Sequence, residues 1–329
     1  MLTVLMATLN GARTLPEVLS AYCQVQAPTG GWKLVIVDNG STDATREIIH
    51  SFMDRLPLTY LFEPSGGKNA ALNTGLASVE GDLVVLTDDD ALPRFDWLKE
   101  LRLAADSHPS FSVFGGQVIP RWENPPEKWI LSKTHLAAIL FSCTDPSWEE
   151  GPILSRSVYG PNMAIRRRIF ETGYRFNPEI GPRGRWYAMG SETELTGRLA
   201  KAGFSAWHCK QAVVEHMVRK FQMTRSWIFS KALKFGRGQY RIVFCHEDVN
   251  QKKYLGIPGY LIREVMATSL KVGCTKLLGK LLGGEAKLFE RRWRLQYFLG
   301  QAIEAHLIHK ELRSNSAVQG LQNSQTRSQ

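Results

Sequence analysis

The sequence predicts a doubly wound α/β fold, with a mostly parallel sheet between helices, followed by a basic helical extension. Continuous apolar runs of four to seven residues end in polar, turn-forming residues, as do strands that are buried on both faces of a parallel sheet. Helical patterns alternate with these runs over the first 120 residues. The net charge of +10 is uneven, because residues 217–329 hold 20 Lys or Arg and only 7 Asp or Glu.

The composition is that of a globular protein in a reducing compartment. The 329 residues are 43% hydrophobic and 22% charged, which is ordinary for folded domains. The five cysteines are scattered without a C-x-x-C spacing, which argues against a disulfide framework and a zinc site. The opening MLTVLMATLNG lacks the pattern of a signal peptide, and no window approaches the roughly 20 apolar residues of a spanning helix. We therefore expect a cytoplasmic protein.

Residues 1–120 are expected to form the first half of the sheet domain. The predicted strands are TVLMATLN, KLVIVDNGSTD, LTYLFEPSGG, DLVVLTDDD and FSVFGGQVIP. The predicted helices are TLPEVLSAYCQ, TDATREIIHSFM and GKNAALNTGLASV. Thr14 and Glu17 have the spacing of a capping box at the start of the first helix. Ligands bind outside the carboxyl ends of the strands in such sheets, so the polar strand ends should converge on one crevice.

Residues 121–216 are expected to complete this domain. The stretch 121–160 is rich in Trp and Pro and has no clear period. Further on, GPNMAIRRRIFETGYRF predicts a strand and a short basic helix, and GSETELTGRLAKAGF predicts a helix. AWHCKQAVVEH predicts a strand that ends at His216, and His208 within it is interpreted as structural. Residues 166–168, three arginines, are interpreted as a solvated face.

Residues 217–313 are predicted to form a basic amphipathic helical extension. In GYLIREVMATSLKVGCTKLLGKLLGG, apolar residues are interleaved with Arg and Lys. Such a pattern is typical of helices that lie on an anionic membrane surface. A basic extension that packs partly in a core explains it equally well. The polar residues 314–329 are expected to be disordered.

Three consecutive carboxylates, Asp88, Asp89 and Asp90, follow the apolar run of residues 83–86. In an extended segment Asp88 and Asp90 share one face, and Asp89 points the other way. Two carboxylates with this spacing can hold Mg²⁺ or Mn²⁺, which prefer few protein carboxylates together with phosphate oxygens. A solvated turn that caps the next helix is the alternative. The strand ends around the three residues favour a metal–diphosphate site.

Asp38 ends another predicted strand, in IVDNGSTD. The pair Asn39-Gly40 predicts a tight turn, and Ser41 or Asp43 can cap the next helix. Neither feature explains an acidic residue at the last strand position, where it would face the crevice. A carboxylate there can accept hydrogen bonds from a base N–H or from ribose hydroxyls.

Several segments, taken in order, resemble the inverting glycosyltransferases of family 2, which have the GT-A fold. They span residues 1–216 and read ATLNGARTLPEVLSAYCQVQ, LVIVDNGSTDATREII, GGKNAALNTGL, TDDDALP, GPNMAIRRRIFETGYRF and GSETELTGRLAKAGF. More loosely, GSETEL with the basic extension resembles bacterial polysaccharide-biosynthesis members. The resemblance implies a nucleotide-sugar-binding half at 1–120, Rossmann-like in form, and an acceptor-binding and catalytic-base half at 121–216.

The resemblance also implies roles for residues of the donor site. Asp38, Thr8 and Asn10 would line the nucleotide pocket, and Asp89 would approach the ribose or the sugar. The pair at positions 88 and 90 would hold Mg²⁺ or Mn²⁺.

Two basic residues could complete the donor site. Lys68 begins the third predicted helix and could neutralise the diphosphate, although a solvated lysine explains it equally well. Some family members use a histidine at the position of His216 as a further metal ligand. A histidine that only ends a strand is the alternative at that position.

The general base of the family is usually the second acidic residue of an E-D-x-E-L pattern, which here reads SETEL over residues 191–195. The resemblance therefore implies Glu192 as the base, with Ser191 in place of the preceding acid. Glu194 precedes Arg198 by four residues and is interpreted as half of a helix ion pair.

The acceptor is expected to contact Asn162, which lies in the acceptor-side segment, and Trp186, whose ring could stack on a sugar. Together these implications predict a metal-dependent inverting glycosyltransferase of the hexosyltransferase type. A UDP-linked donor is favoured, and the acceptor is a hydroxyl of a glycan or of a lipid-linked molecule. The extension would place the enzyme peripherally on the inner face of the membrane.

Two other classes of protein stay open. A sugar nucleotidylyltransferase shares the sheet and the metal, but it would need a Gly-rich, Arg-containing loop after the first strand, where TLNGARTLPE has one Gly. A non-catalytic module for membrane surfaces would explain the basic extension but not the acidic crevice. No nucleic-acid partner is expected, because the basic and aromatic residues match no RNA-binding signature.

Overall fold

The computed structural model describes residues 1–124, 134–184, 186–244, 251–279 and 284–326, without the side chains of 134–137 and 315–326. The chain divides into two compact units. The first consists of Met1–Gly184 and Ser191–Met223, and the second of Arg185–Gly190 and Thr224–Gln329.

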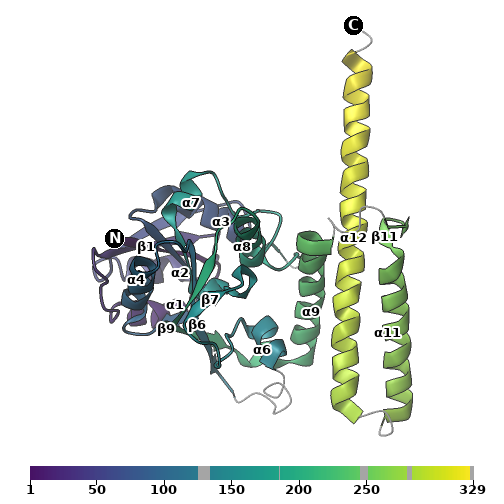
Figure 1. Ribbon diagram of the computed structural model, residues 1–329, viewed down its shortest axis with the longest axis horizontal. Coiled ribbons are helices and arrows are strands. Elements are labelled where there is room, and N and C mark those ends of the chain that lie inside the picture. The colour runs from purple at the N-terminus through teal and green to yellow at the C-terminus, as the bar shows by residue number, and fades with distance from the viewer. Residues whose placement is uncertain (125–133, 185, 245–250, 280–283, 327–329) are drawn as a thin grey trace. The chain divides into compact units, whose positions relative to one another are not determined.

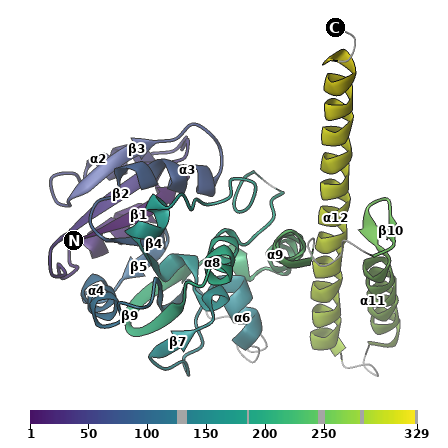
Figure 2. The ribbon, with the colours of Figure 1, turned by 45° about the horizontal axis from the view of Figure 1, so that its top comes forward.

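The described part of the first unit is built on one nine-stranded sheet in the order β3–β2–β1–β4–β8–β6–β9–β5, with β7 paired to β9 (Figure 1). Its first four strands are parallel and fan out side by side in Figure 2, as the sequence predicts. The strands are β1 (Leu2–Thr8), β2 (Trp32–Asp38), β3 (Leu58–Phe62), β4 (Leu83–Asp88), β5 (Ala91–Pro93), β6 (Val113–Trp122), β7 (Gly151–Ile153), β8 (Met163–Arg166) and β9 (Ala206–Val218).

Helices cover both faces of this sheet, which explains the continuous apolar strands. Alternate residues of β1 enter two different cores: Val4 packs with α1 and α4, and Leu5 packs with α3 and α8. The described α-helices are α1 (Leu15–Tyr22), α2 (Thr45–His50), α3 (Lys68–Gly75), α4 (Trp97–Ser107), α6 (Thr134–Phe141), α7 (Arg167–Glu171) and α8 (Ser191–Lys201). The described 3₁₀ turns are Leu76–Ser78, Ser155–Ser157, Gly160–Asn162 and Lys220–Met223.

Two local expectations in this unit are wrong. The capping box of α1 does not form, because Thr14 already has helical angles (φ −105°, ψ −40°) and its hydroxyl donates to the carbonyl of Gly11 at 3.3 Å. Glu17 instead forms an ion pair with Arg121 at 2.5 Å. Arg166 is not part of a solvated face, because its guanidinium donates to the carbonyls of Ala105, His108 and Phe111.

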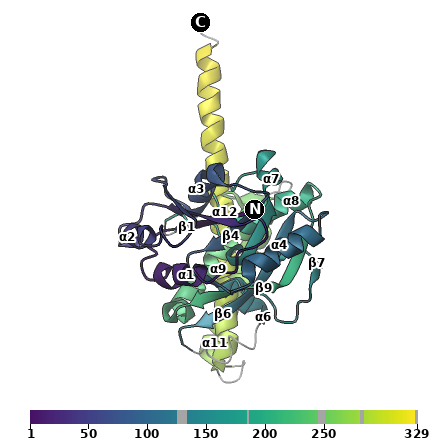
Figure 3. The ribbon, with the colours of Figure 1, turned by 90° about the vertical axis from the view of Figure 1, so that its left-hand side faces the viewer.

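The second unit is helical. Its described elements are α9 (Arg225–Gln239), a π-helical turn (Tyr240–Phe244), the hairpin strands β10 (Lys253–Tyr254) and β11 (Ile257–Pro258), α11 (Gly259–Leu278) and α12 (Gly284–Thr326). α11 and α12 lie side by side, and α12 continues well past α11 (Figure 1, Figure 3). None of the described helices is long and apolar enough to cross a membrane.

The end of α12 differs from the disordered tail expected at 314–329. The helix continues to Thr326. Extending an existing helix fixes one residue for each hydrogen bond formed and avoids the unfavourable nucleation step, so even a polar segment can continue it. The last three residues, 327–329, lie outside the described part of the chain.

Glycines bring α9 and α12 into close contact. A Cβ atom on Gly300 would lie 2.1 Å from the carbonyl oxygen of Leu233, and one on Gly236 would lie 2.0 Å from that of Tyr297. Next to this contact, Glu304 is fully buried and pairs with both Arg237 and Arg241. The backbone approach and the buried ion pairs together fix how these two helices cross.

We expect Gly300→Ala to destabilise the protein by about 1–3 kcal/mol, because its methyl group would overlap a backbone carbonyl that cannot move freely. Gly273→Ala is the matched control, since a Cβ there meets nothing within 4 Å. That substitution should stabilise α11 by about 0.5–1 kcal/mol through helix propensity alone. Chemical denaturation of both variants measures the difference, and equal responses would contradict the packing described.

Candidate active site

The polar strand ends converge, as the sequence predicts. β1, β2 and β4 are adjacent and parallel, so their carboxyl ends meet at one edge of the sheet. Thr8 lies opposite Asp38 in the strand register, and Ala7 lies opposite Asp88. A crevice lined by these residues is the position where ligands bind in open α/β sheets.

Asp38 lies at the carboxyl end of β2, beside Thr8 at the end of β1. It is 2% exposed, and its carboxylate accepts the N–H of Ser41 at 2.8 Å and the hydroxyl of Tyr60 at 3.1 Å. Burial raises the pKa of Tyr60, and the charge of Asp38 raises it further. Sequence reasoning missed Tyr60, although its place on β3, beside β2, puts it near the same strand end.

Two loops next to Asp38 are tied together by Asn10. This residue has a positive φ of 55°. Its side-chain oxygen accepts the N–H of Thr42 at 2.8 Å, and its own N–H donates to the hydroxyl of Ser41 at 2.8 Å. Asn10 therefore holds the loop after β1 to the loop after β2.

The three aspartates point in different directions. Asp89 accepts the hydroxyl hydrogen of Thr8 at 2.5 Å, whereas Asp88 and Asp90 lie near His216. This division agrees with the expected one, although Asp89 and Asp90 form a turn and not an extended segment. Burial raises the pKa of Asp89 to about 7; the charge of Asp90 adds to the rise, and the hydrogen bond from Thr8 opposes it.

Asp88, Asp90 and His216 form a candidate metal centre. One ligand atom from each residue lies within 4.8 Å of the others. β5 pairs with β9 so that Ala91 lies opposite His216, and this register brings the imidazole to the aspartates. Its Nε2 lies 3.3 Å from Asp90, and its Nδ1 lies 2.7 Å from the carbonyl of Phe141.

The donor set suits a divalent ion. Two carboxylate oxygens and one imidazole nitrogen are ligands that Mn²⁺ accepts, and Mg²⁺ favours the carboxylates. With its Nδ1–H donated to a carbonyl, His216 turns Nε2 toward the aspartates, which is the arrangement of many metal-binding histidines. Burial acts to lower the pKa of His216, but the charge of Asp90 outweighs it and raises the pKa.

Lys68 connects the metal-side carboxylates with the predicted base. Its ammonium lies 2.5 Å from Asp88 and 2.8 Å from Glu192. Burial acts to lower the pKa of Lys68, but the two carboxylates outweigh it and raise the pKa. Lys68, at the start of α3, thus joins the end of β4 to the start of α8.

Glu192 lies in the first turn of α8 against Gly160, where a Cβ atom would come within 2.4 Å of its carboxylate. The preceding Ser191 is buried, and its hydroxyl has no hydrogen-bond partner among the described residues. A Cβ on Gly181 would lie 2.0 Å from that hydroxyl. This confined space explains why a serine, and not a longer acid, precedes Glu192.

Glu194 forms the expected ion pair, with its carboxylate 2.6 Å from Arg198. His208 is structural as interpreted, since it is 1% exposed and its Nδ1 lies 3.1 Å from the carbonyl of Gly115. Burial lowers its pKa. Trp186 belongs to the second unit and is 59% exposed, so its expected contact with an acceptor stays a prediction.

Asn162 lies in the core and not on an acceptor surface. It is 0% exposed, its amide donates to the carbonyls of Gln117 and Ala212, and its side-chain oxygen accepts the indole N–H of Trp97 at 2.9 Å. The sequence does not encode these hydrogen bonds, because the three partners lie on elements far from residue 162.

The order of the sheet and the acidic residues at its strand ends fit the GT-A fold. The sequence model of glycosyl transferase family 2 matches residues 3–173, and the chain belongs to this family. The protein is a glycosyltransferase, which removes the nucleotidylyltransferase and the non-catalytic module from consideration.

Two relatives from the archaeon Haloferax volcanii resemble the chain. Glycosyltransferase AglE is 24% identical over 246 residues, which cover 73% of each protein. A glucosyl-dolichyl phosphate glucuronosyltransferase is 23% identical over 198 residues, which cover 60% of this chain and 62% of the relative. The chain therefore spans less than two thirds of the second relative.

A solved mannosyltransferase from Pyrobaculum calidifontis, in complex with GDP-Man and Mn²⁺, has a similar structure. The TM-score is 0.57 at 20% identity, and the alignment covers 93% of this chain and 86% of that one. At this identity the likeness shows a shared fold.

We expect Asn162→Ala to lower the free energy of unfolding by about 3 kcal/mol or more, because it leaves buried groups on three elements without partners, each at a cost of about 1–3 kcal/mol. Urea denaturation measures this loss. An unchanged stability with a raised KM for the acceptor would instead support the acceptor contact that the sequence predicts.

Proposed function

We propose that the first unit transfers a sugar from a nucleotide-sugar to a hydroxyl group with inversion at the anomeric carbon. The observation that carries the proposal is the bridge through Lys68, which sets the metal-side Asp88 and the base candidate Glu192 on either side of one ammonium. An inverting transfer needs both a stabilised leaving group and a nearby base, and these residues offer both within one crevice.

On the donor side, Asp38 and Thr8 face the nucleotide, and Asp88, Asp90 and His216 hold a divalent ion. A bound ion would supply positive charge for the departing diphosphate. The P. calidifontis enzyme was solved with GDP-Man and Mn²⁺, which supports both parts of this assignment. The sequence favours a UDP-linked donor, whereas the P. calidifontis enzyme holds GDP-Man. Experiment therefore has to compare both nucleotides.

On the acceptor side, Glu192 accepts the proton of the attacking hydroxyl. The hydroxyl oxygen forms a bond to the anomeric carbon, and the bond from that carbon to the diphosphate oxygen breaks. General-base assistance of this kind contributes roughly 100- to 10,000-fold to the rate. A single displacement gives the inverted configuration.

The acceptor is a glycan or a lipid-linked molecule, and residues 217–313 hold the enzyme peripherally on an anionic membrane. Support comes from exposed apolar residues on α11, with Met266 67%, Leu270 70% and Leu277 87% exposed. Exposed basic residues, Arg263, Lys271 and Lys276, lie on the same helix. One relative carries a dolichyl phosphate substrate in its name.

The full chain tests this function with a panel of UDP- and GDP-sugars. We expect nucleotide release from one donor in the presence of Mn²⁺ or Mg²⁺, and none after a chelator has removed the metal. Anomeric NMR of the transfer product should show inversion. Retention would contradict a single displacement, and release that is indifferent to the chelator would contradict the metal site.

We expect Glu192→Gln to lower the transfer rate about 100-fold or more, because the amide keeps the shape of the side chain but cannot accept the proton. Binding of the nucleotide-sugar, measured by calorimetry, should stay nearly intact. Glu194→Gln is the matched control: it removes only the helix ion pair with Arg198, worth about 0.3–0.5 kcal/mol. Similar losses in both variants would exclude a special role for Glu192.

A further inference from the structure

The second unit has an apolar groove between α11 and α12. Its volume is about 410 Å³, and its lining includes Ile262, Val265 and Met266 from α11 and Ile303 and Leu307 from α12. All of its described lining residues are apolar except His306. An open apolar groove of this size fits a hydrocarbon chain better than it fits a sugar or a nucleotide.

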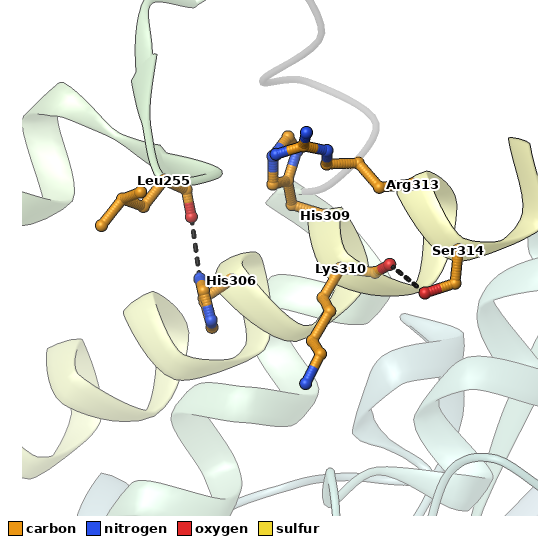
Figure 4. A pocket seen from close by; sticks show the side chains of 6 residues that line it. All are labelled: Leu255, His306, His309, Lys310, Arg313 and Ser314. Carbon is orange, nitrogen blue, oxygen red and sulfur yellow. Dashed lines mark hydrogen bonds between the residues drawn. The ribbon is translucent and has the colours of Figure 1, made fainter. Parts of the chain in front are cut away.

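A basic pocket adjoins the groove. Its volume is about 540 Å³, and it is lined by Leu255, His306, His309, Lys310, Arg313 and Ser314 (Figure 4). The four basic side chains recur at helical spacing on one face of α12. His306 lines both the pocket and the groove, so the two are neighbours.

The basic groups of this pocket are available to an anion. Among the described residues, no carboxylate forms an ion pair with Lys310 or Arg313 within 4.0 Å, whereas the nearby Glu311 pairs with Arg241 at 3.5 Å. Figure 4 shows Lys310 and Arg313 on the same stretch of α12 as His309. Lysine and arginine together are the side chains that proteins use most to bind phosphate.

The rim of the pocket is a hairpin tip in an unusual conformation. Leu255 and Gly256 both have positive φ, 51° and 82°, as a two-residue primed turn requires. Leu255 is 81% exposed, and its carbonyl accepts a hydrogen bond from His306 at 2.8 Å (Figure 4). The turn explains the positive φ of Leu255, and it leaves this apolar side chain exposed beside a basic pocket.

We propose that this pocket binds the phosphate headgroup of a lipid whose hydrocarbon chain lies along the α11–α12 groove. Lys310, Arg313 and His306 contact the phosphate, Leu255 faces the apolar part of the bilayer, and Ile303 contacts the chain. The inference rests on the membrane docking under the proposed function and makes it specific for a class of ligand. A second copy of the chain is a poorer occupant, because two such basic faces would repel one another.

Sedimentation of the full chain with phosphatidylcholine vesicles, with and without phosphatidic acid, tests the inference. We expect binding only when phosphatidic acid is present. Lys310→Gln combined with Arg313→Gln should weaken this binding at least tenfold. The control pair, Lys287→Gln with Arg292→Gln, removes the same charge from exposed positions of α12 outside the pocket and should change binding about twofold or less. Equal losses would mean unspecific attraction to the surface and would overturn the pocket.

Two further arms separate the remaining explanations. Ile303→Gln should also weaken vesicle binding about tenfold, since it puts an amide in the path of the hydrocarbon chain. An unchanged binding would overturn the groove.

An excess of inorganic phosphate should leave most of the vesicle binding intact, because phosphate cannot fill the groove. Complete displacement by phosphate would instead indicate a site for free phosphate. Light scattering identifies a dimer that dissociates in the pocket variants, and that result would assign the face to a second copy.

The failure of the proposed function is distinguishable from the failure of this inference. The pocket variants lie outside the catalytic machinery, so nucleotide release in the absence of vesicles should equal that of the unmodified chain. A protein that binds phosphatidic acid selectively but transfers no sugar would retain the lipid site and lose the proposed function. Thermal unfolding followed by circular dichroism confirms that each variant is folded.

Discussion

The crowding of negative charge at the end of β4 is the constraint on which the site depends. Three adjacent carboxylates at the edge of a buried sheet repel one another unless positive groups lie beside them. In the structure Lys68 reaches them from the start of α3, and His216 reaches them from β9. Glu192 is drawn into the same network because it shares Lys68 with Asp88. Compensation of charge therefore joins elements that are far apart in the sequence.

His216 also indicates how the site could accept a metal. The charge of Asp90 raises the pKa of its imidazole. Binding of a metal to an imidazole requires the neutral form, so the affinity of such a site depends on pH. The carbonyl of Phe141 already holds the opposite nitrogen, so the ring would keep its orientation when a metal binds. Lys68 lies beside Asp88 as a further source of positive charge.

The residues at the strand ends could be predicted from the sequence, but the ion pairs that connect them could not. Apolar runs and helical patterns locate β1, β2 and β4, and the parallel arrangement then brings Asp38 and Asp88 to one edge. The Lys68–Glu192 contact joins residues 124 positions apart, and no periodicity encodes it. The hydrogen bonds of Asn162 were missed for the same reason, since its partners lie on β6, on β9 and in α4. Side chains that form hydrogen bonds between distant segments look like functional residues in the sequence alone.

In the second unit, charges in the interior are paired within the fold, whereas basic residues at the surface pocket are not. This contrast supports a ligand on its surface. In its interior the carboxylate of Glu304 is fully buried and satisfied by Arg237 and Arg241. Leaving either charge unpaired there would be costly, so the fold itself accounts for all three residues. Lys310 and Arg313 lie on the same helix but have no carboxylate partner among the described residues, and they flank an apolar groove. Neither stability nor packing requires that combination, whereas an amphiphile with a phosphate headgroup would use both halves of it.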